Sequence, residues 1–169
     1  MSSVHRIAIC LVRRPGSVVI GLLVMVLASV GLLLASVLPA SAVITPGVPF
    51  TVELTGEAEV DANGVPNQGD LDASGTATLT INPGTGQVCW TIEVEGDIKP
   101  ITAAHIHVGP TTAPGPVVVP LSPTTGCTVV SRELLLAIIL DPSSYYVNVH
   151  NAEFPAGALR GQLDSPGLI

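Results

Sequence analysis

Short segments in which apolar and polar residues alternate one by one constrain the fold of this 169-residue chain more than any other feature. In residues 50–55, Phe50, Val52 and Leu54 alternate with threonine and glutamate. A period of two places successive side chains on opposite faces of a β-strand, one of them buried. This pattern, or a short apolar run that fits it, recurs at residues 76–81, 88–96, 101–108, 117–121, 145–150 and 158–163. The sequence therefore predicts about seven short strands.

The segments between the predicted strands are rich in glycine, proline, asparagine and aspartate. Residues 82–86 (NPGTG) are typical of a tight hairpin connection, and residues 61–75 and 109–116 of longer loops. Pro120 lies within 117–121, which predicts an edge strand, since proline cannot donate to a neighbouring strand. Many short strands with turns between them are typical of an antiparallel β-sandwich or barrel.

Residues 131–140 (SRELLLAIIL) follow a different pattern. Ser131 is a favourable helix N-cap, Glu133 falls in the first turn, and Pro142 follows the end of the segment. These residues predict a helix of two to three turns, with a buried strand as the alternative. The predicted fold class is thus all-β with one short helix.

The first 42 residues have the composition of an export signal. Arg6, Arg13 and Arg14 precede an apolar run from 18 to 38, and the small residues of 39–42 (PASA) form an A-x-A cleavage site. This order is typical of a secretory signal peptide. The apolar run is also long enough for an uncleaved membrane anchor. Both alternatives predict that residues 43–169 are secreted or otherwise extracytoplasmic, at the cell surface or in a periplasm.

The net charge of the predicted mature part limits the kinds of partner that it can bind. All thirteen acidic residues follow position 42, against the three cations Lys99, Arg132 and Arg160, which gives a formal charge of −10. Such a chain repels nucleic acid and anionic membrane surfaces. We therefore expect a protein or surface partner of unknown identity, no nucleic acid, and contact with a membrane only if the N-terminal segment is retained.

Two cysteines, Cys89 and Cys127, lie in the predicted mature part, 38 positions apart. Paired cysteines are the common state in exported proteins. A disulfide that closes a loop of this length stabilises a fold by roughly 4 kcal/mol in the chain-entropy account. Two free thiols are the alternative.

Three histidines fall on strand positions that do not face the core. His105 and His107 share one face of 101–108, with Ile106 on the other. Residues two apart on a strand lie roughly 6.5 to 7 Å apart and point the same way. His150 is likewise on the face of 145–150 opposite its valines.

This histidine pattern has two interpretations. Two imidazoles at H-x-H spacing and a third from a neighbouring strand suit copper or zinc. Alternatively, all three rings are structural and bond to backbone carbonyls or carboxylates. In either case a buried polar cluster needs partners, and Tyr146, Asn148 and Arg160 are candidates for supporting or anion-contacting residues.

The sequence contains no recognisable catalytic motif, such as a G-x-S-x-G elbow, a P-loop or an H-E-x-x-H helix, and no catalytic residue is assigned. The spacing of the acids Glu53, Glu57, Glu59 and Asp61 favours the solvent face of a strand over a calcium or acid–base set. Asp70 and Asp72, in the glycine-rich loop, are predicted to form turns.

Three stretches together resemble the CHRD (chordin-type) domain. They are LTGEAEVDANGVPNQGDLDASGTATLTINPGTGQVCWTIEVEG, AAHIHVGPTTAPGPVVVPL and YYVNVHNAEFPAGALRGQL, and the resemblance covers about residues 50–164. The resemblance implies an exported module. The role of this family is mostly unsettled, so we expect a binding or structural module rather than an enzyme. The growth-factor binding of chordins is not carried over to a chain with one such domain.

A more distant similarity links the same residues to Cu/Zn superoxide dismutase, a Greek-key barrel. By position, His105, His107 and His150 correspond to three copper ligands and Arg160 to an anion-guiding arginine. No histidine remains for the ligand that bridges copper and zinc, and residues 110–120 contain no zinc-ligand cluster. The expected function is therefore an extracytoplasmic CHRD module with a three-histidine copper site, and the alternative is a dismutase-like copper redox enzyme.

Overall fold

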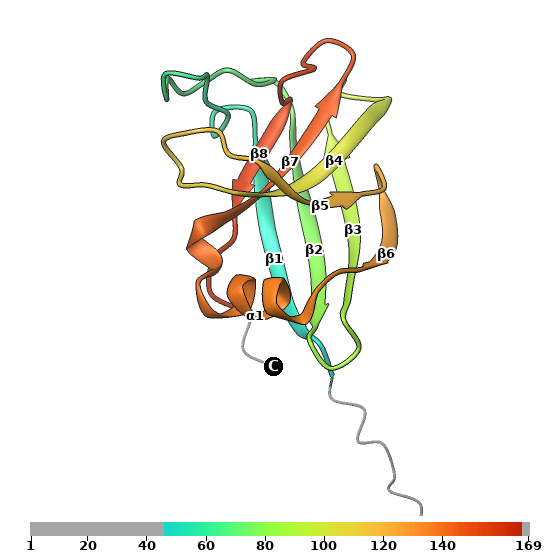
Figure 1. Ribbon diagram of the computed structural model, residues 1–169. Coiled ribbons are helices and arrows are strands. Elements are labelled where there is room, and N and C mark those ends of the chain that lie inside the picture. Colours follow the sequence, from blue (N-terminus) through green and yellow to red (C-terminus); the bar gives the residue numbers. More distant parts are fainter. Residues whose placement is uncertain (1–45, 167–169) are drawn as a thin grey trace, which may run out of the picture. The chain divides into compact units, whose positions relative to one another are not determined.

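The computed structural model describes residues 46–166, so the signal-peptide prediction for 1–42 lies outside the described residues. Strands account for most of the ordered elements (Figure 1). In chain order the elements are β1 (Val48–Thr55), β2 (Ser74–Asn82), β3 (Gln87–Glu95), β4 (Ile101–Val108), β5 (Val117–Leu121), β6 (Thr125–Val129), α1 (Arg132–Leu140), the 3-10 turn η1 (Pro142–Ser144), β7 (Tyr145–Asn151) and β8 (Leu159–Gln162).

All strand pairs are antiparallel and form one sheet in the order β5-β4-β7-β8-β1-β2-β3-β6. The two end strands, β5 and β6, are consecutive in the chain and separated only by residues 122–124. This short connection brings the two ends together, so the sheet curls into a nearly closed barrel (Figure 1). The predicted class, an antiparallel β-sandwich or barrel with one short helix, is confirmed.

The alternating residues build the core as predicted. Phe50, Val52 and Leu54 of β1 are at most 2 % exposed. Val52 lies opposite Ala77 of β2, which lies opposite Ile92 of β3, so that successive strands contribute to the same layer. Apolar burial of this kind is the main stabilising term of such a fold. The core is completed by further aliphatic side chains and one indole, among them Leu79, Ile81, Val88, Trp90, Ile106, Val119, Val147, Val149 and Leu159.

The β2–β3 hairpin turns where the sequence predicts it. The side chain of Asn82 accepts hydrogen bonds from the backbone N–H groups of Gly84 and Thr85, at 2.9 and 3.2 Å. Gly86 closes the turn with a φ of +72°, a conformation that glycine adopts without steric cost.

The predicted helix is also confirmed. Ser131 caps α1 by accepting a hydrogen bond from the N–H of Leu134, and Leu135 and Ile138 are buried against the barrel. Pro142 then opens η1, which leads into β7. No helix within residues 46–166 combines the length and apolar character needed to cross a membrane.

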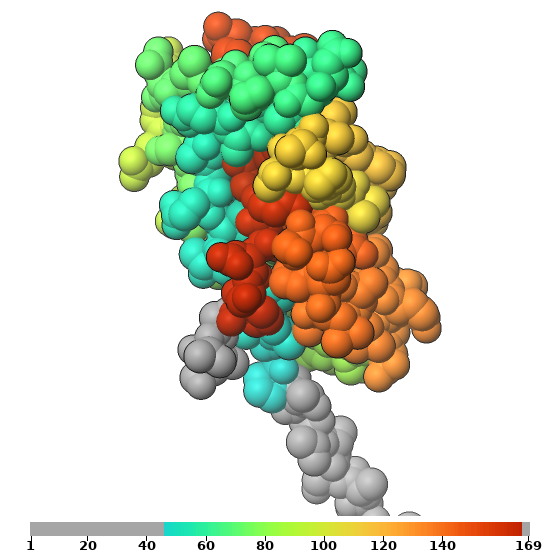
Figure 2. Space-filling view, turned by 90° about the vertical axis from the view of Figure 1, so that its left-hand side faces the viewer, coloured from blue at the N-terminus to red at the C-terminus, as the bar shows by residue number. Residues whose placement is uncertain are grey.

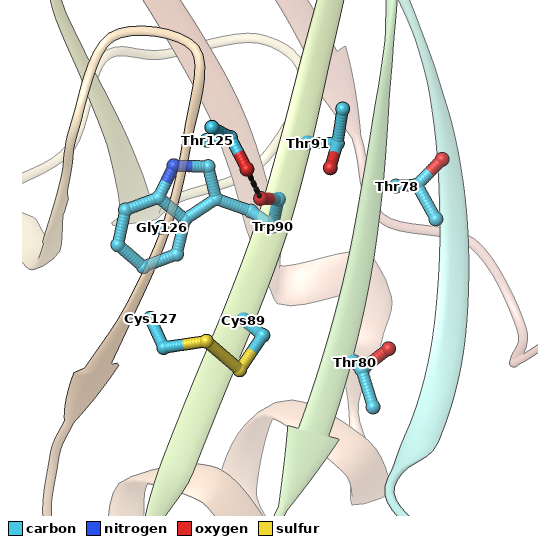
Figure 3. Close-up of a pocket in the computed structure, with 8 residues that line it drawn as sticks. All are labelled: Thr78, Thr80, Cys89, Trp90, Thr91, Thr125, Gly126 and Cys127. Carbon is cyan, nitrogen blue, oxygen red and sulfur yellow. Dashed lines mark hydrogen bonds between the residues drawn. A yellow bond between two sulfur atoms is a disulfide. The ribbon is translucent and has the colours of Figure 1, made fainter.

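Residues 46–166 form eight strands rather than the seven predicted, and β6 is the additional one. Its sequence, TGCTV, has no run of alternating apolar residues. It becomes a strand because it pairs with β3, where Cys127 lies directly opposite Cys89. The two cysteines form the predicted disulfide (Figure 3). Next to it, Gly126 lies against the Trp90 indole, where a Cβ atom would approach Cζ2 to 2.8 Å.

The prediction that Glu53, Glu57, Glu59 and Asp61 share the solvent face of a strand holds only for Glu53, because the other three acids lie beyond the end of β1. β1 ends at Thr55, and Glu59 lies in the turn that follows, where it is 5 % exposed. The chain folds back there because Gly69 donates to the carbonyl of Gly56 and Gln68 to that of Glu59. Glu59 therefore points into the protein. The turn-forming role predicted for Asp70 is confirmed, since its carboxylate accepts from the N–H of Asp72.

Candidate metal centre

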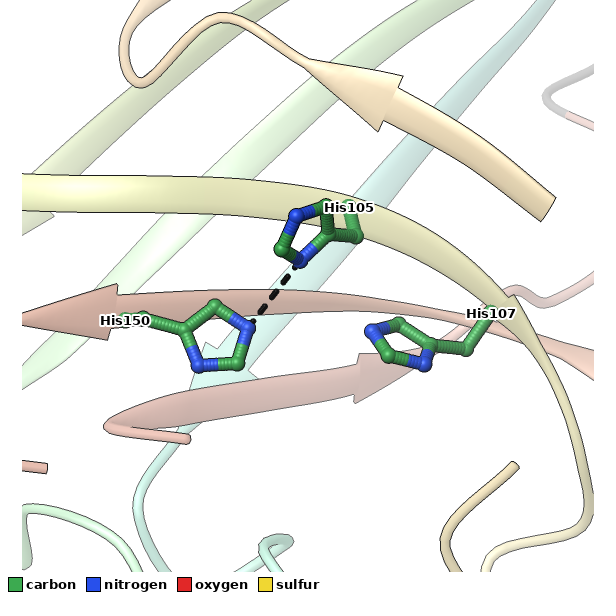
Figure 4. A group of neighbouring side chains, drawn as sticks. All are labelled: His105, His107 and His150. Atoms are coloured by element: carbon green, nitrogen blue, oxygen red, sulfur yellow. Dashed lines mark hydrogen bonds between the residues drawn. The ribbon is translucent and has the colours of Figure 1, made fainter. Parts of the chain in front are cut away.

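Neighbouring strands bring the three histidines together on the outer face of the barrel. His105 and His107 are on β4 and His150 is on β7, which pairs with β4 so that Ala103 is opposite His150. One ring nitrogen from each histidine lies within 4.8 Å of the others, and Figure 4 shows the three rings turned toward one another. As predicted, none of the three belongs to the apolar core, and all three are partly buried.

Loop carbonyl groups define the tautomers of two of these rings. Nδ1 of His107 lies 2.8 Å from the carbonyl oxygen of Gly115, and Nδ1 of His150 lies 3.2 Å from that of Pro155. A carbonyl oxygen can only accept, so each Nδ1 carries the proton. Each Nε2 is consequently a bare lone pair. Metal-binding histidines typically have this arrangement, with one nitrogen anchored to a carbonyl and the other free.

The free nitrogens face a common point. Nδ1 of His105 lies 3.1 Å from Nε2 of His150, which accepts a hydrogen bond from it, and a bound ion would take the place of that shared proton. Two nitrogens bound to one tetrahedral ion at about 2.0 Å would lie about 3.3 Å apart, so this pair already has a ligand-like spacing. Nε2 of His107 has no surface open to solvent and no hydrogen-bond partner. A buried lone pair without a partner is unfavourable, and a metal ion would satisfy it.

Burial also favours the neutral imidazoles that metals require. Desolvation lowers the pKa of His105, His107 and His150 below the usual 6.5. The hydrogen bonds to Gly115 and Pro155 raise the pKa of His107 and His150 and so oppose this effect in part. All three rings are therefore ready to ligate at neutral pH.

Tyr146 packs against the candidate site. Its ring stacks on His107, with centroids 4.8 Å apart and planes 9° from parallel. Its hydroxyl oxygen accepts a hydrogen bond of 3.0 Å from the N–H of Gly115, the residue whose carbonyl anchors His107. Tyr146 thus positions both the histidine and its anchor.

Arg160 reaches Tyr146 from β8, with its guanidinium carbon 3.5 Å from the ring centroid. It is only 2 % exposed, and its guanidinium donates to the carbonyl groups of Pro110 and Ala113 in the loop 109–116. Of the two roles predicted for Arg160, supporting residue and anion contact, these contacts match the supporting one.

Asn148 and Glu59 form a buried polar pair beside the histidines. Asn148 is 3 % exposed, and its Nδ2 donates to Oε1 of Glu59. Burial raises the pKa of Glu59 to about 7, opposed by the positive charge of Arg160 and by a hydrogen bond from the backbone of Val60. Strand parity predicts the position of Asn148. The burial of Glu59 could not be predicted in this way, because a residue in a turn follows no periodic pattern.

Comparisons with known proteins agree with the resemblance seen in the sequence. The family model described as the CHRD domain matches residues 50–163, which include every strand from β2 to β8 and all the residues of the site. No curated protein matches the chain, and no solved structure does. The match spans well over half of the 169 residues, and the chain therefore belongs to the CHRD domain family.

Proposed function

We propose that this CHRD domain is an exported module that binds one copper ion through His105, His107 and His150. The observation that carries the proposal is the convergence of three imidazole nitrogens, with the Nε2 atoms of His107 and His150 left unprotonated by N–H bonds from Nδ1 to loop carbonyls. Purely structural histidines would satisfy both ring nitrogens, whereas Nε2 of His107 has no partner.

The donor set favours copper as the first ion to test. Three imidazoles suit copper and zinc, and the affinity of nitrogen sites for divalent ions is highest for Cu²⁺. The chain would supply the three nitrogens and leave further coordination positions to solvent or to a ligand. Bound copper would supply Lewis acidity and one-electron redox chemistry, while the chain's own groups hold the imidazoles neutral and oriented.

The disulfide between Cys89 and Cys127 supports the extracytoplasmic assignment, because such bonds persist in oxidising compartments. The predicted signal peptide would provide the route. A protein or surface partner would contact the loops 61–75 and 109–116. These loops meet where Gly64 lies against the carbonyl oxygen of Thr112 (Figure 2).

The alternative function is a copper redox enzyme of the superoxide dismutase type. It is favoured by the partial exposure of His105 and His150, which would let a small molecule reach the site. Two features speak against it. The guanidinium of Arg160 is occupied by loop carbonyls, and the net charge repels superoxide.

Metal analysis of the purified chain, refolded with Cu²⁺ and then desalted, tests the proposal. We expect about one copper per chain and an electron paramagnetic resonance spectrum with nitrogen coupling. His105→Ala, His107→Ala and His150→Ala should each lose stoichiometric copper. Thr102→Ala, an exposed change on the same strand β4, should retain it.

Two other results would change the conclusion. Absence of bound copper with all three histidines intact would contradict the proposal, and stoichiometric zinc in its place would correct the ion. A dismutation assay with xanthine oxidase on the copper-loaded sample separates a binding module from an enzyme.

A further inference from the structure

Glu59 is a buried acid that the three-histidine site does not use as a ligand. It is 5 % exposed, and its carboxylate oxygen accepts from Asn148. Two glycines pack closely around it. A Cβ atom on Gly157 would lie 2.6 Å from the carboxyl carbon of Glu59, and one on Gly69 would lie 2.9 Å from its Cγ. The side chain of Glu59 is therefore packed tightly against two backbone segments.

Asn148 connects this carboxyl group to the histidines. It lies directly opposite His105 in the pairing of β4 with β7, and two residues before His150 on the same face of β7. Directly opposite residues on antiparallel strands have Cβ atoms about 5 Å apart. One hydrogen bond and one strand spacing thus separate Glu59 from the site, and Asn148, the residue between them, is itself buried.

The charged group that faces Glu59 is Arg160 of β8, whose positive charge favours the ionised carboxylate. The other groups that contact Glu59 are uncharged: the amide of Asn148 on β7 and the glycines Gly69 and Gly157. The guanidinium of Arg160 also donates to the carbonyls of Pro110 and Ala113. Burial outweighs this attraction, and the pKa of Glu59 stays raised, at about 7.

We infer that Glu59 is the counter-charge of the histidine site: it holds a proton when no cation is bound and releases that proton when a divalent cation binds. The inference rests on the proposed function. The O–H bond of the carboxylic acid breaks, the proton passes to the solvent, and the carboxylate remains. The charge of the buried region then rises by one instead of two. Glu59 touches neither the ion nor its ligands, so it acts as a positioning and charge-compensating residue.

The expected effect follows from electrostatics in a region of low dielectric. A dication and a carboxylate separated by one side chain attract each other well above thermal energy when the effective dielectric constant is about 20. We expect loss of the carboxylate to weaken metal binding by about tenfold or more where Glu59 is ionised. At a pH where Glu59 is protonated before the ion binds, the loss of metal affinity should be smaller. Part of the electrostatic gain is then used to ionise the carboxyl group.

The test titrates the purified chain with Cu²⁺ by calorimetry from pH 6 to pH 8, in two buffers of different ionisation enthalpy, which counts the protons released. Glu59→Gln keeps the acceptor for Asn148 but cannot ionise. Near pH 7 it should release a fraction of a proton less than the wild type, and its affinity deficit should grow from pH 6 to pH 8. The matched control is Glu57→Gln, which removes the same charge from an exposed position two residues away and should behave like the wild type.

A measurement on the unaltered protein covers the case in which Glu59→Gln does not fold. Carbon NMR of the Glu59 carboxyl, with and without Zn²⁺, should show its titration midpoint moving to lower pH when the ion binds. A midpoint that does not move, or equal proton release by wild type and Glu59→Gln, overturns the inference while leaving the metal site intact. If the wild type binds neither ion, the proposed function fails, and the inference with it.

Discussion

Arg160 contacts two parts of the candidate site. Its guanidinium donates to the carbonyl groups of Pro110 and Ala113 and stacks on the ring of Tyr146. A planar group with several donors in fixed directions can make these contacts at once, and a lysine ammonium cannot. Arg160 thus links the loop 109–116 to the tyrosine beneath His107.

We therefore predict that Arg160→Ala lowers the free energy of unfolding by about 3 kcal/mol, because it removes a side chain that is only 2 % exposed, opens a void and takes the donors from two loop carbonyl groups. Arg160→Lys should recover only part of this loss. Urea unfolding followed by tryptophan fluorescence measures both. Arg132→Ala, at the exposed start of α1, is the control and should stay within about 0.5 kcal/mol of the wild type. An Arg160→Ala protein as stable as this control would show that the contacts contribute nothing.

A second prediction concerns Glu59, whose replacement should raise the stability of the folded state, whereas replacement of Arg160 should lower it. The pKa of Glu59 is raised by burial from 4.5 to about 7, so the folded state binds a proton that the unfolded state has lost between these values. The stability contributed by this protonated group is fully present below pH 4.5 and is lost as pH rises through 7. In metal-free buffer, Glu59→Gln should match the wild type near pH 4.5. It should be the more stable protein at pH 8, by up to about 3 kcal/mol.

Unfolding curves at several pH values check this prediction, and Glu57→Gln should show no such pH dependence. A constant difference between Glu59→Gln and the wild type across the range would mean that Glu59 does not titrate abnormally. If the prediction holds, the carboxyl group costs stability without metal, as expected of a group retained for function.

Among the elements, β6 depends most on its covalent link. It is five residues long, and its place beside β3 is reinforced by the disulfide between Cys89 and Cys127. Trp90 donates to the carbonyl of Ser122 at 3.0 Å, and Thr125 donates to the carbonyl of Trp90 at 3.0 Å. These bonds hold the connection from β5 and bring the open edges of the barrel together.

We predict that the double change Cys89→Ser and Cys127→Ser lowers stability by up to about 4 kcal/mol, because the unfolded chain is no longer restrained by a closed loop. Amide hydrogen exchange should show the largest loss of protection in β6. The reduced wild-type protein is the control and should behave like the double variant. Uniform loss of protection over all strands would instead mean that β6 opens only with the whole barrel.

For the whole molecule, the three histidines should make both the stability of the fold and the affinity for metal decrease as the pH falls. Burial lowers the pKa of each below 6.5, so the unfolded state binds more protons as the pH falls. Their contribution to stability is present above pH 6.5 and decreases below it. Glu59 acts in the opposite direction over part of this range, so the histidine effect should be clearest in the Glu59→Gln background.

We also predict that Cu²⁺ raises the melting temperature at pH 7.5. An ion at 1,000 times its dissociation constant adds about 4 kcal/mol to the stability of the state that binds it. The increase should shrink toward pH 5, because protons compete for the imidazoles. Thermal scans of the wild type and of His150→Ala measure the effect. An equal increase in the variant would place the ion elsewhere.

Much of the fold could be predicted because it depends on local patterns. Alternation predicted seven of the eight strands and which side of β1, β2 and β3 is buried, and a capping serine with a following proline predicted α1. β6 could not be found in this way, because five mostly small and polar residues have no apolar period, and their strand conformation comes from pairing with β3.

The sequence by itself determined which histidines share the outer face, since parity along a strand is a local property. Only the tertiary structure decided that β7 lies beside β4, which brings His150 to His105, and that loop carbonyls select the tautomers of His107 and His150. It also decided the burial of Glu59, which comes from a turn folding back onto β7 and β8. The physical reason is that strand order and loop packing are set by contacts between distant residues, and no local periodicity encodes them.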